Sequence, residues 1–275
     1  MTVSADEDAR ACADRAAGAH GLRVSALHDL ADQRELVDLF CRIWRGTPEQ
    51  LLNTNTVRAL AHSGNYVVGA YRGSTLVGAT VAFLGDGHLH SHITGVEPGL
   101  QGAGVGFALK QDQRAWALER GIETVCWTFD PLVSRNAYFN LQKLGGLAEA
   151  YLPDFYGPME DGINLGDASD RIYLRWDLVS PRVVAAAHGK PAELTTSGAE
   201  VLLARNGDEP AEPRQATGSV LLVAVPEDIE ALRAARPDVA ARWRYAVRAT
   251  LTVTLDAGYL ITGITRDGRY VLEHA

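Results

Sequence analysis

The chain has 275 residues, of which 47% are hydrophobic and 22% charged, and its formal net charge is −8. This length and composition are typical of one large or two small globular domains. The acidic balance argues against a nucleic-acid partner, because binding a phosphate backbone needs a basic face. The three scattered cysteines do not fit a disulfide framework or a zinc knuckle.

The sequence carries no signal for export or membrane insertion. Residues 1–21 are acidic and rich in alanine, which predicts a tail or a helix and does not fit a secretory signal. No run of about 18 apolar residues occurs, so we expect no membrane partner. We expect the protein to be cytoplasmic, which also fits its isolated cysteines.

The first part of the chain predicts helices followed by an antiparallel meander. A strand is expected at 22–28. A first helix is expected from Asp32, which fits a capping box with Glu35, as far as Gly46; a second begins near Pro48. Strands and turns then alternate in the order 66–71, 72–74, 75–84, 85–87 and 88–96.

From residue 98 the pattern alternates between helix and strand. The expected elements are a Gly-rich loop (98–106), a helix (107–120) ended by Gly121, a strand (123–129), a helix (134–144) closed by Gly145, and two pairing strands (147–151 and 171–178) around a polar loop (157–169). The sequence therefore predicts an α/β fold with a mixed antiparallel and parallel sheet flanked by helices.

Composition changes after Leu178, and a smaller C-terminal α+β region is expected. Residues 180–197 fit a linker. Further elements are expected at 201–204 and 219–225 (strands), 227–257 (helical, interrupted at Pro237), and 260–265 with 270–273 (a hairpin around Asp267-Gly268). We predict domains at 22–178 and 179–275, the second being an extension or a degenerate half-copy of the first, because the order strand, helix, strand, strand occurs in both.

The loop at 101–106, Gln-Gly-Ala-Gly-Val-Gly, lies between a predicted strand and a predicted helix. Glycines let the backbone approach a ligand closely, and a helix start offers unpaired N–H groups. Together they favour an anion such as a pyrophosphate. A Walker loop is excluded because Phe107 follows Gly106, and the spacing and antiparallel context fit a dinucleotide fingerprint poorly.

The pattern Q-x-x-G-x-G in this loop resembles the GNAT superfamily of N-acetyltransferases. The stretch 94–109, TGVEPGLQGAGVGFAL, resembles the family's signature, and the predicted element order over 22–178 matches. The resemblance implies a GNAT fold and acetyl-CoA as co-substrate. It assigns the pyrophosphate and the pantetheine arm to Gly95, Val96, Gln101, Gly102, Ala103, Gly104, Val105, Gly106 and, on the later helix, Asn136.

Three histidines alternate along the strand before the loop: His88, His90 and His92. Alternate residues share one face of a sheet, and histidine can take a proton near neutral pH. The His-x-His placement resembles arylalkylamine N-acetyltransferases, so we expect His90 and His92 to supply the general base. A metal-dependent hydrolase that uses all three histidines is the alternative; otherwise we expect no metal.

The resemblance also implies a tyrosine acid, at the position that Leu141 occupies here. We therefore expect Tyr138, one turn earlier, to protonate the leaving thiolate; Tyr151 and Tyr156 are weaker candidates. The expected activity is transfer of an acetyl group to a primary amine of a small molecule or peptide. A non-catalytic CoA-binding module remains an alternative, and the sequence leaves open whether the chain forms a homodimer.

Overall fold

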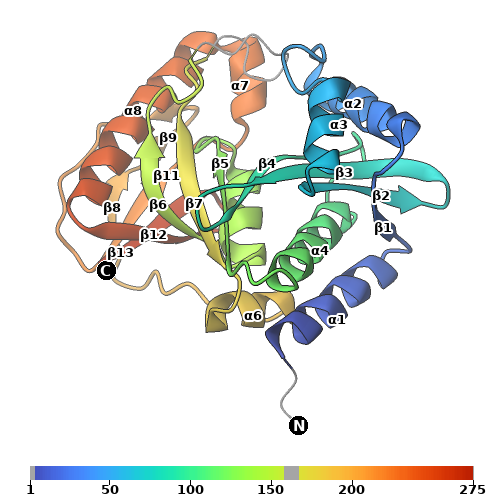
Figure 1. The fold of residues 1–275 in the computed structure, drawn as a ribbon. Coiled ribbons are helices and arrows are strands. Elements are labelled where there is room, and N and C mark those ends of the chain that lie inside the picture. Colours follow the sequence, from blue (N-terminus) through green and yellow to red (C-terminus); the bar gives the residue numbers. More distant parts are fainter. Residues whose placement is uncertain (1–3, 158–166, 275) are drawn as a thin grey trace. The chain divides into compact units, whose positions relative to one another are not determined.

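The computed structural model describes residues 4–157 and 167–274 (Figure 1). It divides into two compact units: unit 1 comprises Met1–Trp127 with Asp177–His188, and unit 2 comprises Thr128–Trp176 with Gly189–Ala275. The predicted boundary between domains, at Leu178, differs from this division into units. Whether residues 22–178 fold on their own stays a prediction. Most of the predicted loop at 157–169 lies outside the described residues.

Unit 1 contains a mixed sheet, as the sequence predicts. Its strands stand in the order β1-β2-β3-β4-β5. β1 to β4 pair antiparallel, whereas β5 pairs with β4 in parallel. The strand bounds are β1 Arg23–Ala26, β2 Tyr66–Arg72, β3 Thr75–Leu84, β4 Leu89–Val96 and β5 Thr124–Phe129.

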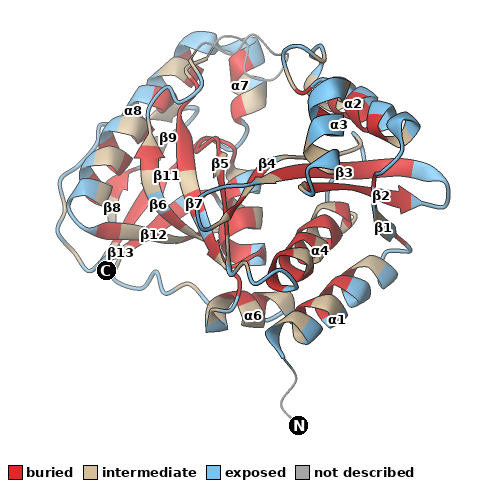
Figure 2. Ribbon diagram, viewed as in Figure 1, coloured by how far each residue is buried: buried red, intermediate tan, exposed pale blue. Residues whose placement is uncertain are grey.

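Helices cover both faces of this sheet (Figure 1). The helices of unit 1 are α1 (Ala5–Gly18), α2 (Leu30–Trp44), α3 (Thr54–His62), α4 (Val105–Leu118) and α6 (Pro181–Ala187). α2 and α3 lie on one face of the meander, and their apolar sides form a core with β2 and β3 through residues such as Phe40 and Val81. α4 lies on the other face, and α1 packs against α4. Figure 2 shows buried residues along the strands and exposed residues on the outer sides of the helices.

Three predicted helix boundaries in unit 1 are wrong. α2 begins at Leu30, so Asp32 lies inside its first turn and forms no capping box there. The helix ends at Arg45, which itself takes the left-handed conformation (φ 51°) expected of Gly46. α3 begins only at Thr54, because the Asn53 side chain accepts a hydrogen bond from the backbone N–H of Thr56 and caps it.

Unit 2 contains a second run of strands, in the order β7-β6-β12-β13-β11-β8. Two antiparallel hairpins, β6/β7 and β12/β13, are joined where Ile261 of β12 faces Ala148 of β6. The bounds are β6 Leu147–Leu152, β7 Arg171–Asp177, β8 Glu200–Leu203, β9 Arg205–Asn206, β10 Glu209–Pro210, β11 Val220–Ala224, β12 Tyr259–Ile264 and β13 Arg269–His274.

The helices of unit 2 are α5 (Ser134–Tyr138), α7 (Ile229–Ala235) and α8 (Pro237–Asp256). The predicted helix at 134–144 continues after α5 as a π-helical turn, Phe139–Lys143. Pro237 begins α8, which is where the sequence places the interruption. The predicted linker at 180–197 is wrong in its first part, because Ser180 caps α6 and Pro181 opens it.

Buried ion pairs hold α7 and α8 to the rest of unit 2. Asp130 accepts hydrogen bonds from Arg233 (2.5 Å) and Arg244 (2.8 Å), and all three side chains are buried. The fully buried carboxylate of Asp170 pairs with Arg248 and accepts a hydrogen bond from the hydroxyl of Tyr151 at 2.6 Å. Asp130 therefore has a structural role in unit 2, beyond the turn that ends β5.

Among the described residues, the helices are too short or too polar to cross a lipid bilayer.

Candidate active site

The glycine-rich loop places a helix start with free N–H groups after β4. Gly102 (φ 83°) and Gly104 (φ 80°) take conformations that other residues avoid, and Gly104 is the N-cap of α4 without any side-chain cap. The first backbone bond into the helix is donated by Ala108 to Gly104. Within the described chain, the N–H groups of residues 104–107 have no backbone acceptor, which leaves them available to an anion.

Two glycines allow helices to approach the sheet beside this loop. A Cβ atom on Gly78 of β3 would lie 2.6 Å from the side chain of Val105, at the start of α4. A Cβ atom on Gly95 of β4 would lie 2.6 Å from Ile43 and 3.0 Å from Trp44, at the end of α2. The predicted arm-binding residue Gly95 therefore also fixes the position of α2, with Trp44 beside it.

The strand that leads to the loop is only partly paired with its parallel neighbour. β4 meets β5 at Leu89↔Val125 and His90↔Cys126. Within unit 1, the described pairs between β4 and β5 end at His90 and Cys126, whereas β4 continues to Val96. Backbone groups on the β5 side of β4, including Gly95 and Val96, can therefore bind an extended ligand as a strand would.

The rings of the three histidines follow one another, as the alternation predicts: His90 and His92 lie on β4, and His88 directly precedes it. The ring centroids of His88 and His90 are 6.5 Å apart, and those of His90 and His92 are 6.3 Å apart. The ring of Phe83 on β3 lies beside His90 (4.9 Å) and His92 (5.7 Å). The row is continuous, although β3 and β4 change register at this point.

His90 and His92 are held in their neutral form. Partial burial, together with the neighbouring His92, His88 and Lys110, lowers the pKa of His90 to about 4. The pKa of His92 is also lowered by desolvation, although its side chain touches solvent. Both imidazoles are therefore unprotonated at pH 7, which is the state that a general base needs.

A buried lysine beneath β4 was missed by the sequence analysis. Lys110 of α4 is 4% exposed and donates hydrogen bonds to Ser91 (2.8 Å) and Gln113 (3.1 Å). Its ammonium lies 3.9 Å from the centroid of the Trp127 ring. In the sequence, the only hint of this burial is a run of polar residues at 110–114 within a predicted helix. These residues are buried because the sheet covers α4 on one side and α1 covers it on another.

The remaining predicted site residues belong to unit 2. Asn136 is exposed on α5, and Tyr138 is half-buried with Arg266 near its ring. The hydroxyl of Tyr151 donates to Asp170, which commits it to the buried ion pairs. Tyr156 is 46% exposed, and its hydroxyl lies 3.0 Å from that of Thr128. The roles given to Asn136 and Tyr138 stay predictions.

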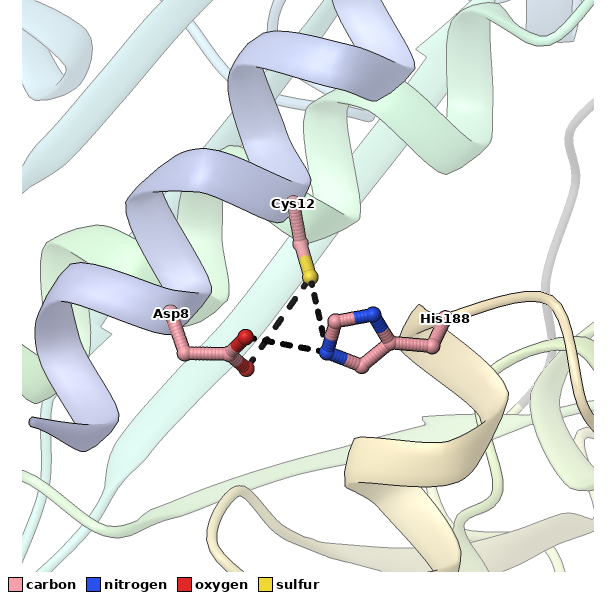
Figure 3. Close-up of side chains that lie close together, drawn as sticks. All are labelled: Asp8, Cys12 and His188. Carbon is pink, nitrogen blue, oxygen red and sulfur yellow. Dashed lines mark hydrogen bonds and ion pairs between the residues drawn. The ribbon is translucent and has the colours of Figure 1, made fainter. Parts of the chain in front are cut away.

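A different trio in unit 1 has the geometry of a metal site (Figure 3). In the described chain, Asp8, Cys12 and His188 are the group whose ligand atoms lie within 4.8 Å of one another. Two guanidinium groups flank them: Arg15 donates to the sulfur of Cys12 at 3.0 Å, and Arg114 lies 3.9 Å from Asp8. These positive charges disfavour a cation, so the trio is best explained as the contact between α1 and α6.

The mixed sheet, the uncapped helix start after β4 and the partly paired β4 define an α/β protein with a site for an extended anionic ligand. The model of an acetyltransferase (GNAT) domain matches residues 4–138. This match includes the glycine-rich loop and His88, His90 and His92. Residues 4–138 therefore match a GNAT acetyltransferase domain, in agreement with the resemblance that the glycine-rich loop predicts.

No curated protein matches the chain in sequence. Solved structures with a similar fold include the ribosomal-protein-S18-alanine N-acetyltransferase from Escherichia coli (13% identity, 58% of this chain and 95% of that one, TM-score 0.47). Others are an N-acetyltransferase from Staphylococcus aureus Mu50 (10%, 57% and 98%, 0.48) and Arabidopsis thaliana Naa50 in complex with a bisubstrate analogue, CoA-Ac-MVNAL (16%, 56% and 97%, 0.47). These likenesses concern the fold alone, and the GNAT resemblance rests on the domain match.

Proposed function

We propose that the protein transfers an acetyl group from acetyl-CoA to a primary amine. The observation that carries this proposal is the start of α4 inside a matched GNAT domain. There Gly102 and Gly104 are left-handed, and the N–H groups of residues 104–107 have no backbone acceptor among the described residues. A diphosphate fits such a site because the N–H groups and the helix dipole both favour negative charge.

The residues of β4 then have separate roles. The backbone of Gly95 and Val96 binds the pantetheine arm on the part of β4 beyond its described pairs with β5. Position 95 must be glycine because Ile43 and Trp44 fill the space that a side chain would occupy. Acetyl-CoA supplies the activated thioester. The protein must orient that thioester and hold an amine beside it.

An amine is mostly protonated at neutral pH, so the reaction needs a base. His90 and His92 are unprotonated and lie on the same strand as the proposed arm-binding residues. A pKa of about 4 makes His90 a weak base in the free protein. Negative charge on a bound ligand raises the pKa of a nearby histidine, which would improve His90 as a base. The proton donor for the leaving thiolate remains a prediction, with Tyr138 as the first candidate.

Calorimetric titration of CoA and acetyl-CoA tests the site. We expect the wild type to bind both and a Gly104→Asp/Gly106→Asp variant to lose binding, because two carboxylates repel a diphosphate. The control for added charge is Gly64→Asp/Gly73→Asp, at two glycines with positive φ and open surroundings. Because a side chain at Gly104 meets His20, the comparison also requires that the Gly104→Asp/Gly106→Asp variant keeps the wild-type circular dichroism spectrum. A folded wild type that binds neither ligand at about 1 mM refutes the proposal.

Binding without turnover would point to the non-catalytic alternative. An acetyl-transfer assay on small amines and on peptides with free N-termini separates the two, with His90→Ala and His92→Ala as negative controls. The acceptor, the cytoplasmic location and a homodimer stay predictions.

A further inference from the structure

The end of α1 lies beside the start of α4. Arg10, in the first half of α1, pairs with Asp112 (2.7 Å) in the second half of α4 and with Glu119 (2.9 Å), the C-cap of that helix. The two helices therefore run antiparallel, with the small buried residues of α1 between them. The turn after α1 is fixed by its own backbone bonds, since Leu22 and His20 both donate to the carbonyl of Ala17.

This turn brings the imidazole of His20 onto the glycine-rich loop. A Cβ atom on Gly104 would lie 2.2 Å from both Cδ2 and Nε2 of His20. Position 104 therefore requires glycine for two reasons: its φ of 80° is unfavourable for other residues, and the His20 ring occupies the space of a side chain. A polar ring nitrogen consequently lies against the N-cap of α4, next to the N–H groups without acceptors.

From this geometry we infer that His20 is a further cofactor-binding residue, whose ring hydrogen-bonds a phosphate of CoA beside Gly104. The inference rests on the proposed function. An imidazole donates a hydrogen bond to an anion in either protonation state, and the protonated ring adds a positive charge to the helix dipole. The sequence pattern of the family does not include this position, because His20 precedes the first strand.

The first test compares ligands with and without phosphates. We expect His20→Ala to raise the Kd of CoA about tenfold, the effect of losing one charge-assisted hydrogen bond. The affinity for pantetheine, which has no phosphate, should not change. The control is His62→Ala, since His62 is exposed at the end of α3 on the other face of the sheet.

Three outcomes overturn the inference. Equal Kd values for CoA in the wild type and His20→Ala mean that the ring only packs. Tighter binding by His20→Ala means that the ring occupies the place of the ligand. An equal loss for pantetheine means that the variant disturbs the fold, which His20→Gln, similar in length and able to donate, checks independently.

A second test needs no ligand and therefore stands if the proposed function fails. Gly104→Ala should lower the melting temperature more in the wild type than in His20→Ala, because only the wild type has the ring in the way. Equal losses in both backgrounds would show that His20 does not lie on Gly104. Absence of CoA binding by the wild type, with this coupling intact, would refute the cofactor role and the proposed function but not the contact.

Discussion

The Nζ atom of Lys110 lies 2.8 Å from the Oγ atom of Ser91, on the inner side of the strand that carries His90 and His92. The contact joins the helix after the glycine-rich loop to the histidine strand. Burial lowers the pKa of this lysine to about 7, so its charge is costly inside the protein. The same residue therefore fixes α4 and makes the domain sensitive to pH.

Replacement of Lys110 by Met should remove that sensitivity. The unfolded chain holds the lysine proton up to about pH 10.5 and the folded chain only to about 7, so wild-type stability rises with pH between these values. We expect a gain of about 2 to 4 kcal/mol from pH 7 to pH 9.5 for the wild type relative to Lys110→Met. Urea unfolding at several pH values measures the difference, and parallel curves would contradict it.

Loss of His90 should reduce turnover more than loss of its neighbour His88. We expect His90→Ala to lower kcat/KM about 100-fold, as for loss of a general base, and His88→Ala to have little effect. A base works when deprotonated, so its contribution is lost only as pH falls through its pKa of about 4. The kcat/KM value follows ionisations of the free enzyme, so the ratio of kcat/KM for the wild type to that for His90→Ala should stay constant from pH 5.5 to 8. A fall in that ratio near pH 6.5 would contradict the assignment.

A methyl group on Gly95 should disturb α2. Gly95→Ala places a Cβ atom 2.6 Å from Ile43 and 3.0 Å from Trp44, so one of the two elements must move. We expect a loss of about 1 to 3 kcal/mol of stability and weaker binding of CoA. Gly18→Ala, at the end of α1 with nothing within 4 Å, is the matched control and should not destabilise the protein. Unchanged stability of Gly95→Ala would show that the close approach is not maintained in solution.

The sequence predicted the strands, the loop and the row of histidines because each depends on local patterns. Period-two alternation and turn glycines specify β2 to β4. The helix predicted to end at 120 ends at Leu118, two residues earlier, and the left-handed Gly121 lies in the turn that follows. Contacts between distant segments have no such pattern. Lys110 is polar by sequence and is buried by α1 and the sheet together, and His20 meets Gly104 only because α1 runs antiparallel to α4.

The arginines of unit 2 were not connected to Asp130 for the same reason, since Arg244 lies 114 residues further along the chain. The rule that glycine takes the left-handed position after a helix also failed once. At the end of α2, Arg45 takes the conformation expected of Gly46.

Removal of the charge on Asp130 should destabilise unit 2. Asp130→Asn leaves Arg233 and Arg244 buried with a neutral partner, so we expect a loss of about 3 kcal/mol at pH 7. The arginines hold the pKa of this carboxyl well below its usual range, so its contribution is present above about pH 4 and is lost as pH falls below that. The wild-type and Asp130→Asn stabilities should therefore converge in acid. Asp238→Asn, at an exposed ion pair on α8, should change little.

Deletion of residues 189–275 should prevent the remaining chain from folding stably. Asp130 and Asp170 would lose Arg233, Arg244 and Arg248, and buried carboxylates without partners are strongly unfavourable. The edge of β6 that pairs with β12 would also be exposed, which favours aggregation. We expect the chain 1–188 to be insoluble or to unfold without a cooperative transition. A soluble, cooperative 1–188 that binds CoA would instead support the predicted domain at 22–178, because that segment would then need nothing from the C-terminal region.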